Sequence, residues 1–362
     1  METSSRSQDA LDSLIKQASL ALVPAVVKLD LTYACNQKCV HCCVVPERRE
    51  DLSLEEIRVL FAEIADKGCL YLSLSGGEIF LRKDLPDILE EAQRCGFSLR
   101  LMTNGSLIPP EMIPRMRKYR VGEVDVSLYG DTAEVHESVT RVAGSFEKTV
   151  ASIRRMREAG IRIKIGLIIL KQNIHRFRQM VDLAESLGTT WNLDGSILRR
   201  FDGSEAPLAF QVPVSELADV VEYRERRMPD LKHMKEAWNR EKWLEGVPCG
   251  AGRAMCTISP YGDVFPCSVM PMLAGNIREQ SFAEIWDHSE VLKRVRAIRR
   301  RDLETCATCE LAPFCVLCPG RSVLDNGSLT EPSLFRCSET AIHRDVYEKI
   351  YLEGGSCDEP RE

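Results

Sequence analysis

The chain has 362 residues, of which 44% are hydrophobic and 28% are charged. This length and composition exclude global disorder and suit one domain of about 200–250 residues together with a smaller one. The formal net charge of −6 gives no footprint for sequence-independent nucleic-acid binding, so we expect no nucleic-acid partner.

The sequence also lacks the marks of a membrane or secreted protein. The most apolar run, residues 18–27, is interrupted by Pro24 and falls short of the roughly 20 residues of a membrane span. The N-terminus has no basic region like that of a signal peptide, so we expect a cytoplasmic protein with no membrane partner. The 15 cysteines cluster at 35–42 and at 249–337, and such clusters in a reducing compartment predict metal sites rather than disulfides.

The predicted elements begin with a short helix over 9–22 and then alternate between strands and helices. The predicted strands span 25–31, 70–74, 98–102, 123–128, 161–170 and 191–198. Apolar residues at helical spacing predict helices that follow Ser53 and that cover 85–95, 111–119, 146–159 and 174–187. This alternation predicts an α/β fold with a parallel sheet. Six strand–helix units are too few for the eight-fold barrel, so we expect an open or partial one.

The pattern changes after residue 198. Residues 214–245 are charged and helical, and the chain from Cys249 onward is rich in Cys, Gly and Pro, so we expect metal to help fold it. A final helix is predicted over 339–352. The expected division is an N-terminal helical extension (1–24), a partial barrel (25–200), a helical linker (201–247), a small cysteine-rich domain (248–340), and a C-terminal helix and tail (341–362).

The first cysteine group, Cys35, Cys39 and Cys42, follows the first predicted strand with the spacing C-x3-C-x2-C. Three thiolates can hold a [4Fe–4S] cluster and leave one iron open for a ligand. A structural zinc site is the alternative, with His41 or Cys43 as the fourth ligand. Cys43 also creates a second register, C-x3-C-x3-C.

At these residues the sequence resembles the radical S-adenosylmethionine (SAM) superfamily, whose signature is C-x3-C-x2-C after the first barrel strand. The resemblance continues through residues 75–78 (Ser-Gly-Gly-Glu), 103–105 (Thr-Asn-Gly), 127–130 (Ser-Leu-Tyr-Gly) and Asn173, each after a successive strand. It implies a partial (β/α)6 radical SAM barrel.

The resemblance also implies a SAM site. Gly76 and Gly77 would receive the methionine end of SAM, and Glu78 could pair with its ammonium group. Ser127 and Arg141 are candidates for binding its ribose or carboxylate, although Thr140 competes with Arg141 for the same alignment position. The implied cofactor-binding set is Gly76, Gly77, Glu78, Asn104, Ser127, Arg141 and His41, the last of which replaces a usual aromatic residue. The implied reaction is reductive cleavage of SAM to a 5′-deoxyadenosyl radical, which abstracts hydrogen from a C–H bond.

The C-terminal cysteines resemble the SPASM domain, which carries auxiliary clusters in many radical SAM maturases. The first part of the pattern is Cys249-x12-Gly262-x4-Cys267. In the central run, 306–318, two residues separate the last two cysteines, where the family commonly has three. By the family pattern one [4Fe–4S] cluster would use Cys249, Cys256, Cys267 and Cys318, and another would use Cys306, Cys309, Cys315 and Cys337. We therefore expect three [4Fe–4S] clusters in all. If Cys318 did not bind, the first auxiliary cluster would have an open iron, and structural zinc sites remain the alternative.

The function that the resemblance implies is a radical SAM oxidoreductase or maturase. Its most frequent substrate in the family is a peptide, which would be crosslinked or otherwise oxidised. Ser268 stands where sulfatase maturases carry a catalytic Asp, which disfavours that activity. The alternatives are a radical SAM enzyme acting on a small molecule, such as a tetrapyrrole or an alcohol, and a non-catalytic iron–sulfur electron carrier.

The implied partners are an electron donor, such as flavodoxin or ferredoxin, and a peptide or small-molecule substrate. Only about 24 residues precede the first predicted strand, so a peptide would need a separate leader-peptide-binding protein or would bind without a leader. No catalytic acid or base can be named. Asp125, Tyr129, Asp194 and Arg199 near predicted strand ends are candidates to face the cavity, and Cys69 and Cys95 are expected to be core residues.

Overall fold

The computed structural model describes residues 13–353. Residues 13–21 are helical, and the predicted start of that helix lies outside the described residues, as does Cys357. No helix in the described part of the chain is long and apolar enough to cross a membrane.

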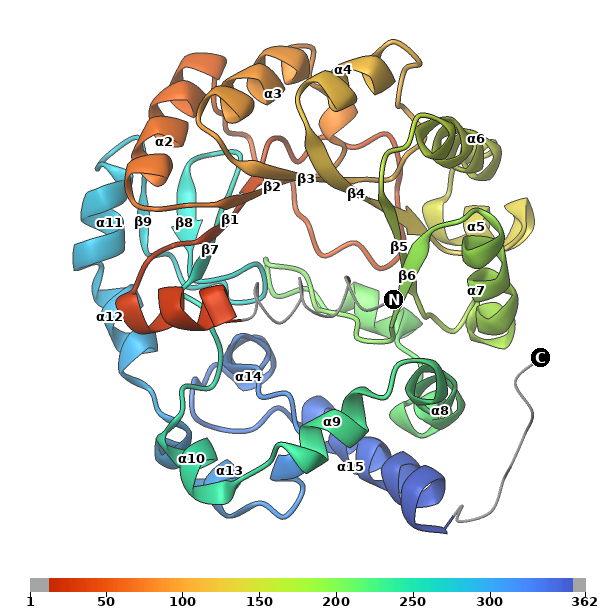
Figure 1. Cartoon of the computed structure of the whole chain (residues 1–362), viewed down its shortest axis with the longest axis vertical. Coiled ribbons are helices and arrows are strands. Elements are labelled where there is room, and N and C mark those ends of the chain that lie inside the picture. Colours follow the sequence, from red (N-terminus) through yellow and green to blue (C-terminus); the bar gives the residue numbers. More distant parts are fainter. Residues whose placement is uncertain (1–12, 354–362) are drawn as a thin grey trace. The chain divides into compact units, whose positions relative to one another are not determined.

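A single mixed sheet, in the order β6-β5-β4-β3-β2-β1-β7-β8-β9, organises the first part of the fold (Figure 1). Strands β1 to β6 are parallel, β7 joins β1 in parallel, and β8 and β9 are antiparallel additions. The strands are β1 (Val26–Asp30), β2 (Tyr71–Ser75), β3 (Ser98–Thr103), β4 (Val121–Leu128), β5 (Ile163–Ile168), β6 (Thr190–Asp194), β7 (Met255–Ile258), β8 (Asp263–Phe265) and β9 (Gly275–Asn276). The six predicted strands and their parallel arrangement are confirmed.

The helices that connect the parallel strands cover the outer face of the sheet (Figure 1). They are α2 (Leu54–Asp66), α3 (Leu85–Arg94), α4 (Met112–Lys118), α5 (Ala133–Thr140), α6 (Ser145–Glu158) and α7 (Phe177–Ser186). The helix α2 begins as predicted, because the Ser53 hydroxyl and the Glu56 carboxylate each accept the other's backbone N–H. The short helix α5, which is only eight residues long, was not predicted from the sequence.

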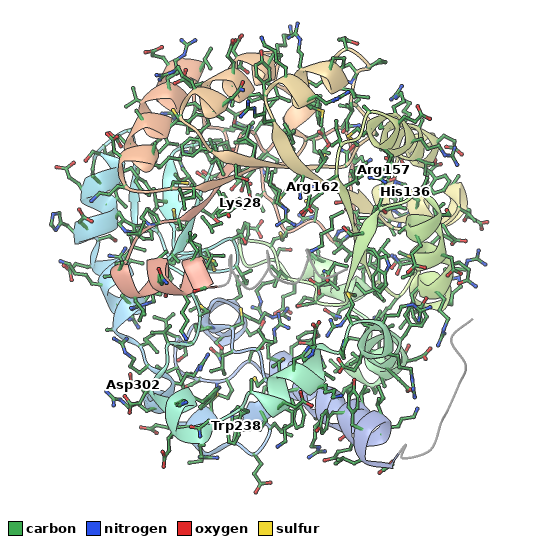
Figure 2. All side chains as sticks on the ribbon, in the orientation of Figure 1. Lys28, His136, Arg157, Arg162, Trp238 and Asp302 are labelled. Atoms are coloured by element: carbon green, nitrogen blue, oxygen red, sulfur yellow. The ribbon has the colours of Figure 1, made fainter. Side chains whose placement is uncertain are left out.

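Alternation along the strands separates an apolar outer face from a polar inner one. On β1, Val27 and Leu29 are fully buried beneath the helices, whereas Lys28 and Asp30 point the other way. Figure 2 shows Lys28 on the side of the sheet away from α2, α3 and α4. The inner face of this open sheet therefore carries charged side chains.

The chain divides into two compact units that cut across the predicted domain boundaries. Unit 1 contains residues 1–210 and 250–297, and unit 2 contains residues 211–249 and 298–362. The segment 250–297 supplies β7, β8, β9, α11 (Phe282–His288) and α12 (Glu290–Ala297) to unit 1. It buries Phe282, Ile285 and Trp286 almost completely, and α11 packs against α2, so this part of the cysteine-rich region shares the apolar core of unit 1.

Unit 2 is helical. It comprises α8 (Ala218–Arg227), α9 (Asp230–Glu236), α10 (Arg240–Glu245), α13 (Glu304–Thr308), α14 (Pro319–Asn326) and α15 (Leu334–Glu348). Val221, Leu231 and Val346 form its buried apolar cluster. The final helix begins five residues earlier than the predicted start at 339, because Ser333 caps it by accepting the N–H of Arg336.

Arg82 ties the two ends of the cysteine loop together in unit 1. Its Nη1 donates to the carbonyl oxygens of Leu31 (3.0 Å) and Leu52 (2.7 Å), which lie before and after the loop. Its Nη2 pairs with Asp84 at 2.6 Å, and the side chain is 11% exposed. Two backbone carbonyls and a carboxylate therefore depend on one guanidinium.

We predict that Arg82→Met lowers the free energy of unfolding by about 2–4 kcal/mol, because three acceptors lose their donor in a largely buried place. Arg301→Met is the matched control, since Arg301 makes an ion pair with Glu245 in which both side chains are exposed, and its loss should cost less than about 1 kcal/mol. Denaturant unfolding followed by circular dichroism measures both. Equal losses in the two variants would contradict a special role for Arg82.

Candidate functional site

The three cysteines of the first group lie around a cavity of about 710 Å³ in unit 1, at the carboxyl ends of β1 to β4. The cavity also contains several residues singled out in the sequence. Its lining comprises Tyr33, Ala34, Cys35, Gln37, Lys38, Cys39, His41, Cys42, Cys43, Val44, Pro46, Ser75, Gly76, Gly77, Met102, Thr103, Asn104, Ser127, Tyr129 and Arg200. The structure thus brings together residues from five separate segments of the sequence.

Gly76 and Gly77 are required by the approach of two loops. The Gly77 N–H donates to the Thr32 carbonyl at 2.7 Å, and a Cβ on Gly77 would lie 2.3 Å from the Ala34 carbonyl oxygen. A Cβ on Gly76 would lie 2.2 Å from the Thr32 oxygen, and its φ of +140° also favours glycine. The glycines therefore let the loop after β2 pack against the cysteine loop, and both still line the cavity.

Glu78 does not line the cavity. It is fully buried, and its carboxylate accepts hydrogen bonds from the Thr103 hydroxyl (2.7 Å), the Asn104 N–H (2.8 Å) and the Phe80 N–H (3.1 Å). Burial raises the pKa of this carboxyl group, and the hydrogen bonds partly offset that effect. In the structure, the Glu78 carboxylate holds the loops together through these hydrogen bonds, and its expected pairing with the ammonium group of SAM stays a prediction.

Asn104 connects the loop after β3 to the cysteine loop. Its Nδ2 donates to Asn36 Oδ1 at 2.9 Å and lies 3.9 Å from the Cys35 sulfur. Its Oδ1 accepts from Ser106, and its carbonyl accepts from Thr149 at 2.9 Å. The amide of Asn104 is therefore held in place, with one edge against a proposed metal ligand.

The cysteine loop fits a metal cluster by the chemistry of its unsatisfied groups. Burial raises the pKa of the Cys39 thiol to about 12, so a bound metal is needed to keep it as a thiolate. The Cys39 sulfur lies 3.5 Å from Gln37 Oε1, while the buried Gln37 Nε2 has no partner among the described residues. A thiolate can only accept a hydrogen bond, so metal binding would turn this amide and satisfy Nε2.

His41 packs against Tyr129 in an edge-on contact, with 4.9 Å between ring centroids. Burial lowers the pKa of His41 to about 4, so its ring is neutral at pH 7. The Tyr129 backbone is fixed in turn by His136 Nδ1, which accepts its N–H at 3.2 Å. His41 therefore presents a neutral aromatic ring to the cavity.

The structure separates the two residues proposed for ribose or carboxylate binding. Ser127 lines the cavity, whereas Arg141 is an exposed left-handed residue (φ +61°) at the end of α5. Thr140 serves the site through its carbonyl, which accepts the Lys38 N–H at 3.0 Å. Arg200 lines the cavity and was missed, because nothing in its sequence surroundings distinguishes it from the adjacent Arg199.

Of the strand-end candidates, only Tyr129 lines this cavity; Asp125, Asp194 and Arg199 are not part of its wall. Arg100 pairs with Asp125 on the inner face of the sheet. Arg199 pairs with Glu205 at 3.1 Å. Asn173 is fully buried, and its amide donates to the Tyr129 and Ile168 carbonyls, so it fixes loops.

A second cavity of about 490 Å³ adjoins the first, since Tyr33, Cys43, Val44 and Gly76 line both. Most of its other residues come from β1, β7, β8 and the turn after β8, which includes Cys267. Its polar centre is Asp30, which lies 2.8 Å from Lys28 Nζ and receives a 3.4 Å hydrogen bond from the Tyr33 hydroxyl. This cavity has the size of a small-molecule or side-chain pocket.

Cys256 and Cys267 are not brought together. Thr257 and Ser259, which flank Ile258, line the second cavity with Cys267, so alternation turns Cys256 to the opposite face of the sheet. Cys256 is 2% exposed there, and burial, followed by the neighbouring Cys69, raises the pKa of its thiol. Cys69 is buried as expected, and Cys95 is half-buried.

Unit 2 gathers its own thiols. Cys306, Cys315, Cys318 and Cys337 line one small cavity. Burial, followed by the nearby Cys315, Cys337 and Cys309, raises the pKa of the Cys306 thiol to about 11. The Cys315 thiol also interacts with Thr340 on α15. Within the described residues, no three His, Cys, Asp or Glu side chains converge on the position of a single metal ion.

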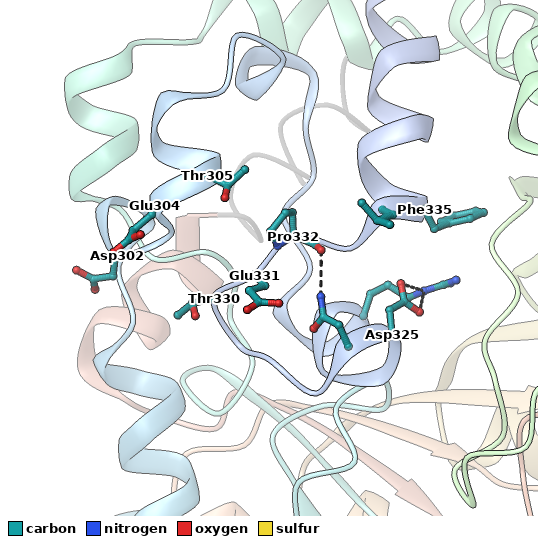
Figure 3. Close-up of a pocket in the computed structure, with 11 residues that line it drawn as sticks. Asp302, Glu304, Thr305, Asp325, Thr330, Glu331, Pro332 and Phe335 are labelled. Carbon is teal, nitrogen blue, oxygen red and sulfur yellow. Dashed lines mark hydrogen bonds and ion pairs between the residues drawn. The ribbon is translucent and has the colours of Figure 1, made fainter.

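A wider groove of about 920 Å³ lies beside these thiols in unit 2 (Figure 3). It shares Thr330, Glu331 and Pro332 with the thiol cavity. Asp325 in its wall pairs with the nearly buried Arg321 at 2.9 Å, and Asn326 donates to the Pro332 carbonyl at 3.1 Å. These contacts give the groove a defined wall, and Asp302, Glu304 and Glu331 make its mouth acidic.

Two segments of the chain match known protein families. Residues 29–184 match the radical SAM superfamily, and residues 249–310 match the SPASM iron–sulfur cluster-binding domain. The AdoMet-dependent heme synthase of Methanosarcina barkeri is 29% identical over 85% of this chain and 95% of its own length. The mycofactocin maturase MftC of Mycolicibacterium smegmatis is 29% identical over 82% of this chain and 78% of its own length.

The fold is shared with a solved structure. Streptococcus suis SuiB bound to the precursor peptide SuiA superposes with a TM-score of 0.68 over 91% of this chain and 80% of SuiB, at 16% identity. At this sequence identity, the similarity between the two proteins concerns the fold.

We predict that Gly77→Ala lowers the free energy of unfolding by more than about 3 kcal/mol, because the new Cβ would collide with a backbone oxygen that cannot move independently. The amount of iron bound per chain after anaerobic reconstitution should also fall in this variant. Gly166→Ala is the control, because its Cβ would meet nothing nearer than 4.0 Å. A Gly77→Ala protein with normal stability and iron would refute the close approach of the loops.

We further predict that Cys256→Val leaves the iron content unchanged, because this thiol faces the core. Cys267→Val should instead remove about four iron atoms per chain, the content of one [4Fe–4S] cluster. Iron analysis of both reconstituted proteins measures the difference. An equal loss of iron in the two variants would show that Cys256 is a cluster ligand.

Proposed function

We propose, on the basis that this chain belongs to the radical SAM superfamily and carries a SPASM domain, that it is an enzyme that cleaves SAM reductively and uses the resulting radical to oxidise a peptide. The observation that carries the proposal is the cavity in which three cysteines meet the paired glycines and Asn104. An electron carrier would need no such cavity beside its cluster.

The cofactors of the proposed reaction are SAM and three [4Fe–4S] clusters. Cys35, Cys39 and Cys42 would hold the first cluster. Cys306, Cys309, Cys315 and Cys337 would hold a second within unit 2, and Cys267 would contribute to a third. A [4Fe–4S] cluster with an open iron supplies the electron that cleaves SAM into methionine and a 5′-deoxyadenosyl radical.

The chain's own residues would bind and orient SAM and keep water out. Gly76 and Gly77 bring backbone groups to the wall of the cavity, and Ser127 offers a hydroxyl there. The neutral His41 ring, supported by Tyr129, provides a flat apolar surface. Asn104 and Glu78 hold the loops that carry these groups.

The second cavity is the proposed place of the substrate. It adjoins the first, so a substrate C–H bond there would lie next to the SAM site. Loss of one hydrogen atom to the radical, followed by loss of one electron and one proton, oxidises the substrate by two electrons. An auxiliary cluster would accept that electron, and the polar centre formed by Lys28, Asp30 and Tyr33 is the group available to the proton.

A peptide is the favoured substrate, because the maturase MftC and the peptide-bound SuiB are among the similar proteins. A tetrapyrrole is the second candidate. It is favoured by the identity with a heme synthase over 95% of that protein's length. The physiological reductant would be a flavodoxin or ferredoxin. A separate leader-binding protein would present a peptide substrate. The proposed location of the protein is the cytoplasm.

The first test measures SAM cleavage. The reconstituted enzyme with SAM and dithionite should release 5′-deoxyadenosine, and the variant with Cys35, Cys39 and Cys42 changed to Ala should release none. The control is Cys69→Ala, a buried thiol away from the cavity, which should keep the activity. Wild-type protein that holds about 12 iron atoms but neither binds nor cleaves SAM would refute the proposal.

The second test separates the substrate classes. Peptides encoded beside the gene and an iron-containing tetrapyrrole are each incubated with the enzyme, SAM and reductant, and product masses are recorded. A peptide product lighter by 2 Da, the mass of about two hydrogen atoms, together with one equivalent of 5′-deoxyadenosine, supports the peptide. A changed tetrapyrrole with unchanged peptides would replace the peptide proposal with the second candidate.

A further inference from the structure

The side chain of Arg200 lies in the wall of the three-cysteine cavity without an ion-pair partner among the described residues. Arg200 follows β6 and lines the cavity, where its buried Nε has no hydrogen-bond partner among the described residues. The buried Nε of the adjacent Arg199 also has no partner among the described residues, but its Nη2 pairs with Glu205 at 3.1 Å. The loop itself is fixed, because the Phe201 N–H donates to the Cys43 carbonyl at 3.2 Å and the Arg200 N–H donates to Ser204 at 2.9 Å.

The described wall of the cavity offers Arg200 no carboxylate as a partner, and its proposed thiolates would be bound by the cluster. None of the described residues that line it is an Asp or a Glu, and Glu78 is turned away and satisfied by its neighbours. The cationic side chains are Arg200, which is half-buried, and Lys38, which is exposed. His41 adds no charge, because burial lowers its pKa to about 4.

A half-buried guanidinium without a carboxylate partner favours a ligand that carries an anionic group. SAM has one such group, the carboxylate of its methionine part, and its ammonium and sulfonium groups are both cationic. The planar guanidinium matches a carboxylate with two parallel hydrogen bonds, which a lysine cannot make.

We propose that Arg200 binds the carboxylate of SAM and thereby fixes the methionine end of the molecule in the cavity. This is the task that the sequence assigned to Arg141, which is exposed at the end of α5. The inference rests on the proposed function, since it requires SAM to bind at the three-cysteine cavity.

The test is a binding measurement, so it does not depend on turnover. Isothermal titration of the oxidised, cluster-loaded enzyme is carried out with SAM and with decarboxylated SAM, which lacks the carboxylate. Arg200→Gln should weaken SAM binding by about 10- to 100-fold, the effect of losing a charge-assisted hydrogen bond. The same variant should bind decarboxylated SAM as the wild type does, within about twofold, because the carboxylate that Arg200 contacts is absent.

Arg199→Gln is the matched control and should leave SAM affinity within about twofold of the wild type. Lys38→Gln and Arg141→Gln test the two competing carboxylate partners, and each should weaken SAM binding less than Arg200→Gln does. Arg200→Lys should fall between wild type and Arg200→Gln, and it carries the test if Arg200→Gln fails to fold or to hold iron.

Three results would overturn the proposal while leaving SAM cleavage intact. They are normal SAM affinity in Arg200→Gln, equal losses for the two ligands, and a large loss in Lys38→Gln or Arg141→Gln instead. A wild-type enzyme that binds neither ligand would refute the proposed function itself, which is a separate outcome.

Discussion

The geometry of the site depends on a carboxylate that has no access to solvent. Glu78 accepts hydrogen bonds from the loop after β3, while its own N–H donates to the Ala34 carbonyl of the cysteine loop at 2.9 Å. One buried group therefore joins the ends of β1, β2 and β3. Leaving such a group without a partner costs about 1–3 kcal/mol, more if it is charged, so the loops hold one arrangement.

The second constraint is that an open sheet has two unlike faces. The outer face is buried under helices and is apolar, whereas the inner face carries Lys28, Asp30 and the Arg100–Asp125 pair. In a closed barrel, packed side chains would fill the interior. Here the sheet does not close on itself, and its polar inner face adjoins two neighbouring cavities.

The cysteine-rich region is divided between the two compact units. Its first part adds β7 to the free edge of β1 and buries Trp286, whose Nε1 donates to the Leu22 carbonyl at 2.6 Å. Its second part lies in unit 2 with the thiols around Cys306. Hydrogen bonding to a strand edge helps to hold the first part, which also carries Cys267, and the second part brings together the thiols of unit 2.

The sequence by itself determined the parallel α/β architecture, the three-cysteine loop and the two groups of cysteines, because strand–helix alternation and ligand spacing are local patterns. Only the tertiary structure decided that Glu78 faces a neighbouring loop, that Arg200 and not Arg141 lines the cavity, and that Cys256 lies on the opposite face of the sheet from Cys267. The reason is that a side chain's surroundings depend on which distant loops and strands meet it. Spacing along one segment does not contain that information.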